Sequence, residues 1–154
     1  MFGKLFVCCV PVMMFYDHST ITKITLMPGN MKPKILIVDD QPEVYQVIKM
    51  FLGSSYDTVY QNNGKGAYEE LNSGNIPDMI LADIKMPGYD GYELLVHIKQ
   101  NESLSKIPVM MISNLEASKE RGRFLDAGAI DYMEKPFNDS ELRTRITTYL
   151  RPTA

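Results

Sequence analysis

Short apolar runs alternate with segments of helical periodicity from Lys32 onward. The apolar runs lie at residues 35–38, 58–60, 79–82, 109–112 and 130–133. The segments of helical periodicity follow them, at residues 42–52, 65–73, 89–101, 117–127 and 138–150. This alternation is typical of β/α units that build a parallel sheet. The pattern therefore predicts five strands and five helices.

Three of the apolar runs are continuous: ILIV at 35–38, MILA at 79–82 and VMMI at 109–112. A strand without polar alternation is buried on both faces, so these three runs are predicted to be central strands. Right-handed crossovers between parallel strands place helices on both faces of the sheet. The fold class is therefore α/β, with an open doubly wound sheet whose chemistry lies at the carboxyl ends of the strands.

Residues that favour helix starts support these assignments. Pro42 suits the first turn of its helix, and Asp90 followed by Gly91 is typical of a helix start. Asn138 precedes Glu141 by three residues, the spacing of a capping box.

The first 31 residues have a different composition from the rest of the chain. They contain two lysines and one aspartate, whereas residues 32–154 have a net charge of −4. The apolar run at 5–16 is shorter than the ~20 residues that a membrane-spanning helix needs, and no typical signal-peptide cleavage site follows it. We expect residues 1–31 to be a poorly ordered extension, or Met31 to be the native first residue, with the domain at 32–151. The alternative is an amphiphilic anchor with Cys8 or Cys9 acylated.

Composition narrows the class of protein further. A chain of 154 residues corresponds to one domain, and a net charge of −3 without long basic blocks argues against nucleic acid as a direct ligand. The only two cysteines are adjacent, which provides no disulfide framework and favours a reducing compartment. We expect a cytoplasmic protein that makes no membrane contact.

Charged and hydroxyl side chains follow four of the predicted strands. Asp39 and Asp40 follow ILIV, Asp83 follows MILA, Ser113 follows VMMI, and Lys135 comes shortly after the last run. Three acids at one sheet edge repel one another, and a hard cation such as Mg²⁺ relieves that repulsion. One carboxylate can then act as a nucleophile toward a phosphoryl group, while an ammonium and a hydroxyl bind the phosphoryl oxygens.

Four sequence stretches carry a family resemblance. KILIVDDQPEV (34–44), DMILADIKMPGYDGYELL (78–95), Ser113 after PVMMI, and YMEKPF (132–137) resemble the receiver domain of two-component response regulators. The resemblance covers residues 33–150 and is strongest to the stand-alone chemotaxis-type regulators. It implies a flavodoxin-like fold with five helices and a five-stranded parallel sheet in the order 2-1-3-4-5.

The resemblance also implies roles for individual residues. Asp83 would be the phosphoacceptor, phosphorylated by a sensor histidine kinase or a histidine phosphotransfer protein. Mg²⁺ would be the cofactor, held by Asp39, Asp40, Asp83 and the main-chain carbonyl of Lys85. Ser113 and Lys135 would contact the phosphoryl group, and Ser113 would move with Tyr132, the aromatic switch. The residue before Pro136 would form a cis peptide bond. The face made by the fourth helix, fifth strand and fifth helix would carry the output.

Two neighbours of the site depart from the family pattern. Lys85 places a cation two residues after the acceptor, and Asn114 is larger than the alanine or glycine frequent there. We expect a phosphorylated state that decays slowly. Because the chain ends shortly after residue 150, we also expect no attached output domain, a downstream protein target bound in trans, and no enzymatic activity of its own.

Two other classes of function use the same residues. One alternative is a Mg²⁺-dependent aspartyl-phosphate phosphatase of the haloacid-dehalogenase type. The resemblance to such enzymes would require the pattern D-x-D after the first strand, whereas Gln41 follows Asp39 and Asp40 here. A phosphorylation-independent, receiver-like scaffold is the other alternative. Such a scaffold needs none of Asp40, Asp83, Ser113 and Lys135, and all four are present.

Overall fold

The computed structural model describes residues 32–150, without the side chains of residues 117–119. Residues 1–31 and 151–154, which include the predicted extension and both cysteines, lie outside the described part of the chain. The elements are β1 (Lys34–Val38), α1 (Pro42–Leu52), the 3₁₀ helix η1 (Gly53–Ser55), β2 (Asp57–Gln61), α2 (Gly64–Asn72), β3 (Met79–Asp83), α3 (Gly91–Gln100), β4 (Val109–Ser113), α4 (Ala117–Asp126), β5 (Asp131–Glu134) and α5 (Asp139–Tyr149).

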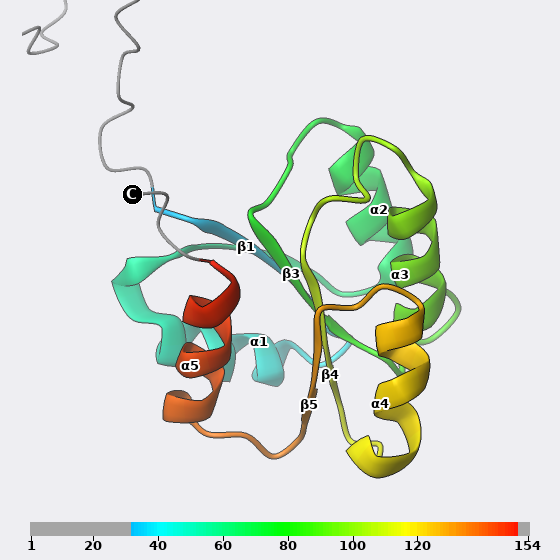
Figure 1. Ribbon diagram of the computed structural model, residues 1–154. Coiled ribbons are helices and arrows are strands. Elements are labelled where there is room, and N and C mark those ends of the chain that lie inside the picture. Colours follow the sequence, from blue (N-terminus) through cyan, green and yellow to red (C-terminus); the bar gives the residue numbers. More distant parts are fainter. Residues whose placement is uncertain (1–31, 151–154) are drawn as a thin grey trace, which may run out of the picture. The chain divides into compact units, whose positions relative to one another are not determined.

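One sheet of parallel strands forms the centre of the domain. The strand order is β2-β1-β3-β4-β5, and every neighbouring pair is parallel. Helices α1 and α5 cover one face, and α2, α3 and α4 cover the other (Figure 1). This arrangement confirms the predicted doubly wound α/β fold and its strand order.

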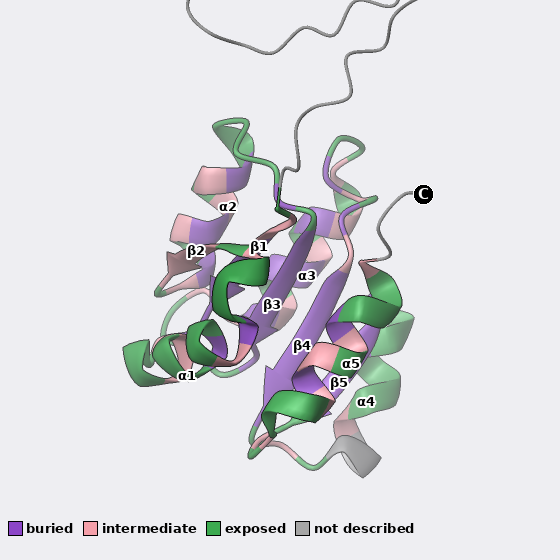
Figure 2. Ribbon diagram, turned by 90° about the vertical axis from the view of Figure 1, so that its left-hand side faces the viewer, coloured by how far each residue is buried: buried purple, intermediate pink, exposed green. Residues whose placement is uncertain are grey.

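The core lies on both faces of the sheet. Because side chains alternate along a strand, Leu36 and Val38 of β1 pack with α2, α3 and α4, whereas Ile35 and Ile37 pack with α1 and α5. Strands β3 and β4 are buried along their whole length, and the helices expose their outer sides (Figure 2). The prediction of central strands from continuous apolar runs is confirmed.

Local hydrogen bonds explain where several helices begin. Asp90 caps α3 by accepting from Glu93 N at 2.8 Å, and the Glu93 carboxylate accepts from Asp90 N at 3.1 Å. Asn138 caps α5 by accepting from Glu141 N at 2.9 Å. The predicted start of α3 at residue 89 was two residues early, because Asp90 is the cap and the helix begins after it.

Other predicted bounds differ from the structure by about one residue. The strand predicted at 130–133 runs from Asp131 to Glu134, one residue later, and η1 was not predicted. Gly53 ends α1 with a φ of 58°, a conformation that glycine adopts without steric cost, and the chain then tightens into η1. No helix in the described part of the chain is long and apolar enough to cross a bilayer.

Candidate functional site

The carboxyl ends of the central strands bring the predicted polar residues to one edge of the sheet. Asp39 follows β1, Asp83 is the last residue of β3, and Ser113 is the last residue of β4. All three are buried, at 2%, 6% and 1% exposure. Parallel strands in register end together, so these side chains meet although they come from distant parts of the sequence.

Lys135 connects two of the carboxylates. Its ammonium nitrogen Nζ donates to Asp39 Oδ2 at 2.7 Å and to Asp83 Oδ1 at 3.0 Å. A backbone hydrogen bond holds the residue in place, because Lys135 N donates to Ser113 O at 2.7 Å. The peptide bond between Lys135 and Pro136 is cis. The structure thus has the expected cis bond and brings Asp39, Asp83 and Lys135 together.

Burial sets the protonation of this cluster. It raises the pKa of the Asp83 carboxyl; Lys135 counteracts this only in part, and the charges of Asp39 and Asp40 raise the pKa further. Burial acts in the opposite direction on Lys135, but the hydrogen bonds and charges of Asp39 and Asp83 outweigh it, so the pKa of the ammonium is raised. Lys135 therefore stays charged, and its single ammonium is shared between the Asp39 and Asp83 carboxyl groups.

One carboxylate oxygen at this edge has no partner. Asp40 Oδ1 is buried without a hydrogen bond, whereas Asp39 Oδ1 accepts from Gln41 N at 2.9 Å. A buried and unsatisfied carboxylate oxygen is costly unless a cation or water binds it. Hard oxygen donors with excess negative charge are the set that Mg²⁺ prefers. The residues present therefore fit a Mg²⁺ ion.

The acidic side chains do not form a closed cage. Among residues 32–150, no group of three Asp, Glu, His or Cys side chains is arranged to hold a metal ion. Mg²⁺ usually keeps several waters and takes only one or two carboxylates, so such a cage is not required. The assignment of Asp39, Asp40, Asp83 and the Lys85 carbonyl as metal ligands stays a prediction.

Ser113 and Tyr132 lie next to the cluster. Leu115 N donates to Ser113 Oγ at 3.3 Å, and the Tyr132 hydroxyl donates to Leu115 O at 2.7 Å. Tyr132 is only 1% exposed, and its ring packs against Phe124 of α4 at a centroid distance of 5.9 Å. The expected switch residue therefore has the inward orientation in this structure. Its role as a switch stays a prediction.

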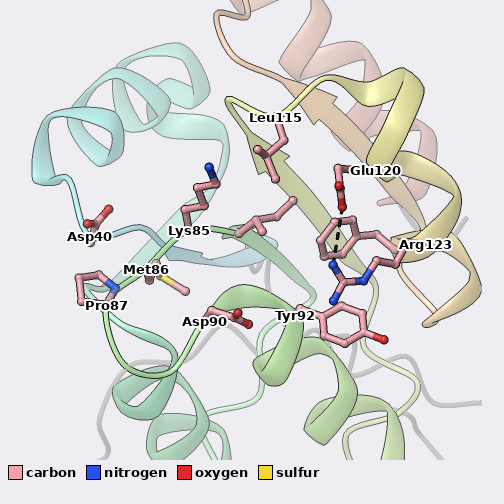
Figure 3. Close-up of a pocket in the computed structure, with 11 residues that line it drawn as sticks. Asp40, Lys85, Met86, Pro87, Asp90, Tyr92, Leu115, Glu120 and Arg123 are labelled. Carbon is pink, nitrogen blue, oxygen red and sulfur yellow. Dashed lines mark ion pairs between the residues drawn. The ribbon is translucent and has the colours of Figure 1, made fainter.

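A cavity of about 610 Å³ lies at this edge of the sheet, where Ile84 and Lys85 follow β3 (Figure 3). Asp40 and Lys85 line one side of it, and α3 and α4 contribute Tyr92 and Arg123 on the other. Lys85 is exposed, as expected for a side chain beside the site and not within the core. The predicted effect of Lys85 on the phosphorylated state is not tested by this geometry.

Sequence reasoning missed two groups of residues around the site. Arg123 lies over the ring of Tyr92 at 4.1 Å and pairs with Glu120 at 3.7 Å, closing one wall of the cavity (Figure 3). Asp131, 4% exposed, accepts from Arg121 of α4 at 3.1 Å and from Arg145 of α5 at 2.7 Å. No sequence motif marks these contacts. The only signal in the sequence is an acid, Asp131, near the start of the last predicted strand.

The chain is similar to parts of longer signalling proteins. The chain is similar to the Transcriptional regulatory protein CpxR homolog of Haemophilus influenzae, with 36% identity over 79% of this chain and 52% of that protein. It is also similar to the sensor histidine kinase TmoS of Ectopseudomonas mendocina, with 30% identity over 77% of this chain and 12% of that protein. The chain therefore spans about half of the regulator and a small part of the kinase.

The domain also resembles a solved structure. The receiver domain of the Francisella response regulator 1452 aligns with a TM-score of 0.70 and 33% identity, over 77% of this chain and 96% of that one. The family model of the response regulator receiver domain matches residues 35–147. Fold, strand-end residues and these matches agree, and the chain belongs to the response regulator receiver domain family, the phosphorylation-accepting switches of two-component signalling.

Proposed function

We propose that Asp83 is the phosphoacceptor of this receiver domain and that its donor is a phosphohistidine of a sensor histidine kinase or of a phosphotransfer protein. The observation that carries the proposal is the Lys135 ammonium, which bridges Asp39 and Asp83 at 2.7 and 3.0 Å beside the unpartnered Asp40 oxygen. A carboxylate held next to a fixed cation can attack a phosphorus atom, which supports this assignment.

The transfer exchanges one bond to phosphorus for another. An Asp83 carboxylate oxygen attacks the phosphorus, the bond between phosphorus and the histidine nitrogen breaks, and that nitrogen keeps the bonding electron pair. Lys135 then exchanges its contact with Asp83 for a phosphoryl oxygen and holds the charge that develops there. The Ser113 hydroxyl, one residue beyond the β4 residue paired with Asp83, donates to a second phosphoryl oxygen.

Mg²⁺ would be held by Asp39, Asp40, Asp83 and the main-chain carbonyl of Lys85. When bound, it supplies positive charge that offsets the charge of the carboxylates and of the transferred group. The unpartnered Asp40 oxygen and the excess of acids over cations support this assignment. The side chains of this chain do the remaining work: Lys135 orients the acceptor, and Asp39 orients Lys135.

The output would use the face formed by α4, β5 and α5, with Ser113 and Tyr132 as the switch pair. The contact between Tyr132 and Leu115 O connects the switch to the β4–α4 loop. Asp131 connects the three output elements, because its two oxygens accept from Arg121 of α4 and Arg145 of α5. A movement of the Ser113 side chain would therefore occur next to the packed α4, β5 and α5 elements, whose surface a target protein can recognise.

The experiment that tests the acceptor is a mass measurement. The protein is incubated with Mg²⁺ and acetyl phosphate, or with a phosphorylated histidine kinase, and the intact mass is recorded. We expect one added phosphoryl group on wild-type protein and none on Asp83→Ala. Asp57→Ala is the matched control, because Asp57 is an exposed acid at the opposite edge of the sheet.

The same experiment separates the alternatives. Folded wild-type protein that takes no phosphoryl group from either donor contradicts the proposal and leaves the scaffold interpretation. Phosphorylation that persists in Asp83→Ala shows that another residue is the acceptor.

A further inference from the structure

The loop between β3 and α3 carries the carbonyl that is proposed to bind Mg²⁺, and its base is closed by direct backbone contact. Gly91 N donates to Ile84 O at 2.9 Å. A Cβ atom at Gly91 would lie 2.0 Å from Asp83 O, so only glycine allows the start of α3 to approach the acceptor strand this closely. This contact joins the two ends of the loop, and Lys85 directly follows Ile84 at the first end.

A second contact holds the loop at Tyr89. The first residue of α2, Gly64, packs directly on Tyr89: a Cβ atom there would lie 2.4 Å from Tyr89 Cδ1 and 2.7 Å from Tyr89 O. On its other side, the Tyr89 ring stacks on His97 of α3 with a centroid distance of 5.4 Å. The Tyr89 hydroxyl is hydrogen bonded to His97 Nδ1. Tyr89 is therefore wedged between two helices.

Only Met86, Pro87 and Gly88 separate Lys85 from Tyr89, and Gly88 turns the chain with a φ of 79°. Pro87 has a fixed φ, and Tyr89 N donates to Pro87 O at 3.1 Å, which closes a tight turn. Met86 is buried at 6% exposure, whereas Lys85 and Pro87 are exposed. Because this segment is short and Met86 within it is buried, a displacement of Tyr89 changes the path of the backbone that leads to Lys85.

We propose that Tyr89 is a positioning residue, which fixes the β3–α3 loop between α2 and α3 and thereby places the Lys85 main-chain carbonyl for Mg²⁺. This inference rests on the proposed function, since it assigns a metal ligand to that loop. It assigns the task to the tyrosine ring, because the contacts to Gly64 and His97 involve the ring and the backbone on both sides. The hydroxyl bond to His97 is secondary.

Mg²⁺ titration of the full chain by isothermal calorimetry tests this inference without a phosphoryl donor. Tyr89→Ala removes the ring, and we expect the dissociation constant for Mg²⁺ to rise about tenfold, as it does when groups that orient metal ligands are removed. Tyr89→Phe keeps the ring and should restore the affinity to within about twofold of wild type. His97→Ala, a change at an exposed position, opens one side of the wedge and should weaken binding about threefold, an intermediate loss.

Tyr68→Ala is the matched control. Tyr68 lies on α2 and also contacts the His97 ring, at 5.9 Å, but the contacts of the loop described above do not involve it. Tyr68→Ala removes the same type of side chain from the packing around α2 and α3, so both alanine variants should lower the melting temperature. Only Tyr89→Ala should weaken Mg²⁺ binding.

Four results overturn the inference. Equal Mg²⁺ affinities of wild type and Tyr89→Ala do so directly. An equal loss of affinity in Tyr68→Ala and Tyr89→Ala shows a general loosening of the helices and no positioning role. If Tyr89→Ala does not fold, unchanged affinity in His97→Ala has the same consequence. Wild-type protein that binds no Mg²⁺ overturns the proposed metal site as well as the role of Tyr89. Wild-type binding with unchanged affinity in Tyr89→Ala overturns only the role of Tyr89.

Discussion

Replacing Asp83 with asparagine should stabilise the folded domain, although it removes one of the two carboxylates bound to Lys135. Asp83 is almost completely buried, and burial raises the pKa of its carboxyl more than Lys135 lowers it. The ionised side chain is therefore destabilising at neutral pH. Asparagine has the same shape and keeps an acceptor for Lys135, while Asp39 still pairs with that ammonium. We expect a gain of about 1–2 kcal/mol in the free energy of unfolding, the lower part of the range for replacing buried charges.

The gain should depend on pH with a defined sign. The pKa of Asp83 is higher in the folded state than in the unfolded state, so the folded state binds more protons just above the unfolded value. The destabilisation by the ionised Asp83 carboxylate is absent below the pKa of this carboxyl in the unfolded state, about 4. It is complete above the pKa of the same carboxyl in the folded state. The advantage of Asp83→Asn over wild type should therefore be small near pH 4 and should grow as pH rises.

Urea unfolding with EDTA present, followed by circular dichroism at about pH 4 and about pH 7, measures this difference. Asp57→Asn makes the same chemical change at an exposed position and should stay within about 0.5 kcal/mol of wild type at both pH values. The reasoning is refuted if Asp83→Asn is less stable than wild type near pH 7, or if its gain is the same at both pH values.

Three further predictions concern the neighbours of Asp83. Mg²⁺ at a hundred times its dissociation constant should raise the free energy of unfolding by about 2.7 kcal/mol, and Asp40→Asn should reduce that increase, as urea unfolding with and without EDTA would show. Lys135→Met leaves Asp39 and Asp83 without their shared donor and should lower the free energy of unfolding by about 3–5 kcal/mol; a loss below about 1 kcal/mol in the same assay contradicts this. Lys85→Asn should speed loss of the phosphoryl group, followed by intact mass, by on the order of threefold, or about 0.65 kcal/mol; an unchanged rate removes the role given to Lys85.

Much of this protein follows from its local sequence. The continuous runs ILIV, MILA and VMMI identify the central strands, because only a strand covered on both faces is apolar at every position. Once those strands are parallel, Asp39, Asp83 and Ser113 must share an edge, since each stands at or directly after a strand end. Asp90 and Asn138 cap their helices with bonds to residues three positions away, which sequence spacing reveals.

Other features depend on contacts between segments that are far apart in the sequence. Lys135 bonds to Asp39 and Asp83, while Asp40 keeps an unpartnered oxygen, and no spacing distinguishes the three acids. The wedging of Tyr89 against Gly64 joins residues 25 positions apart through the packing of α2 on the loop before α3. Hydrophobic periodicity and capping are set within a few residues. The partner of a buried side chain is decided by strand register, helix packing and the competition of all neighbouring charges at once, and these exist only in the folded domain.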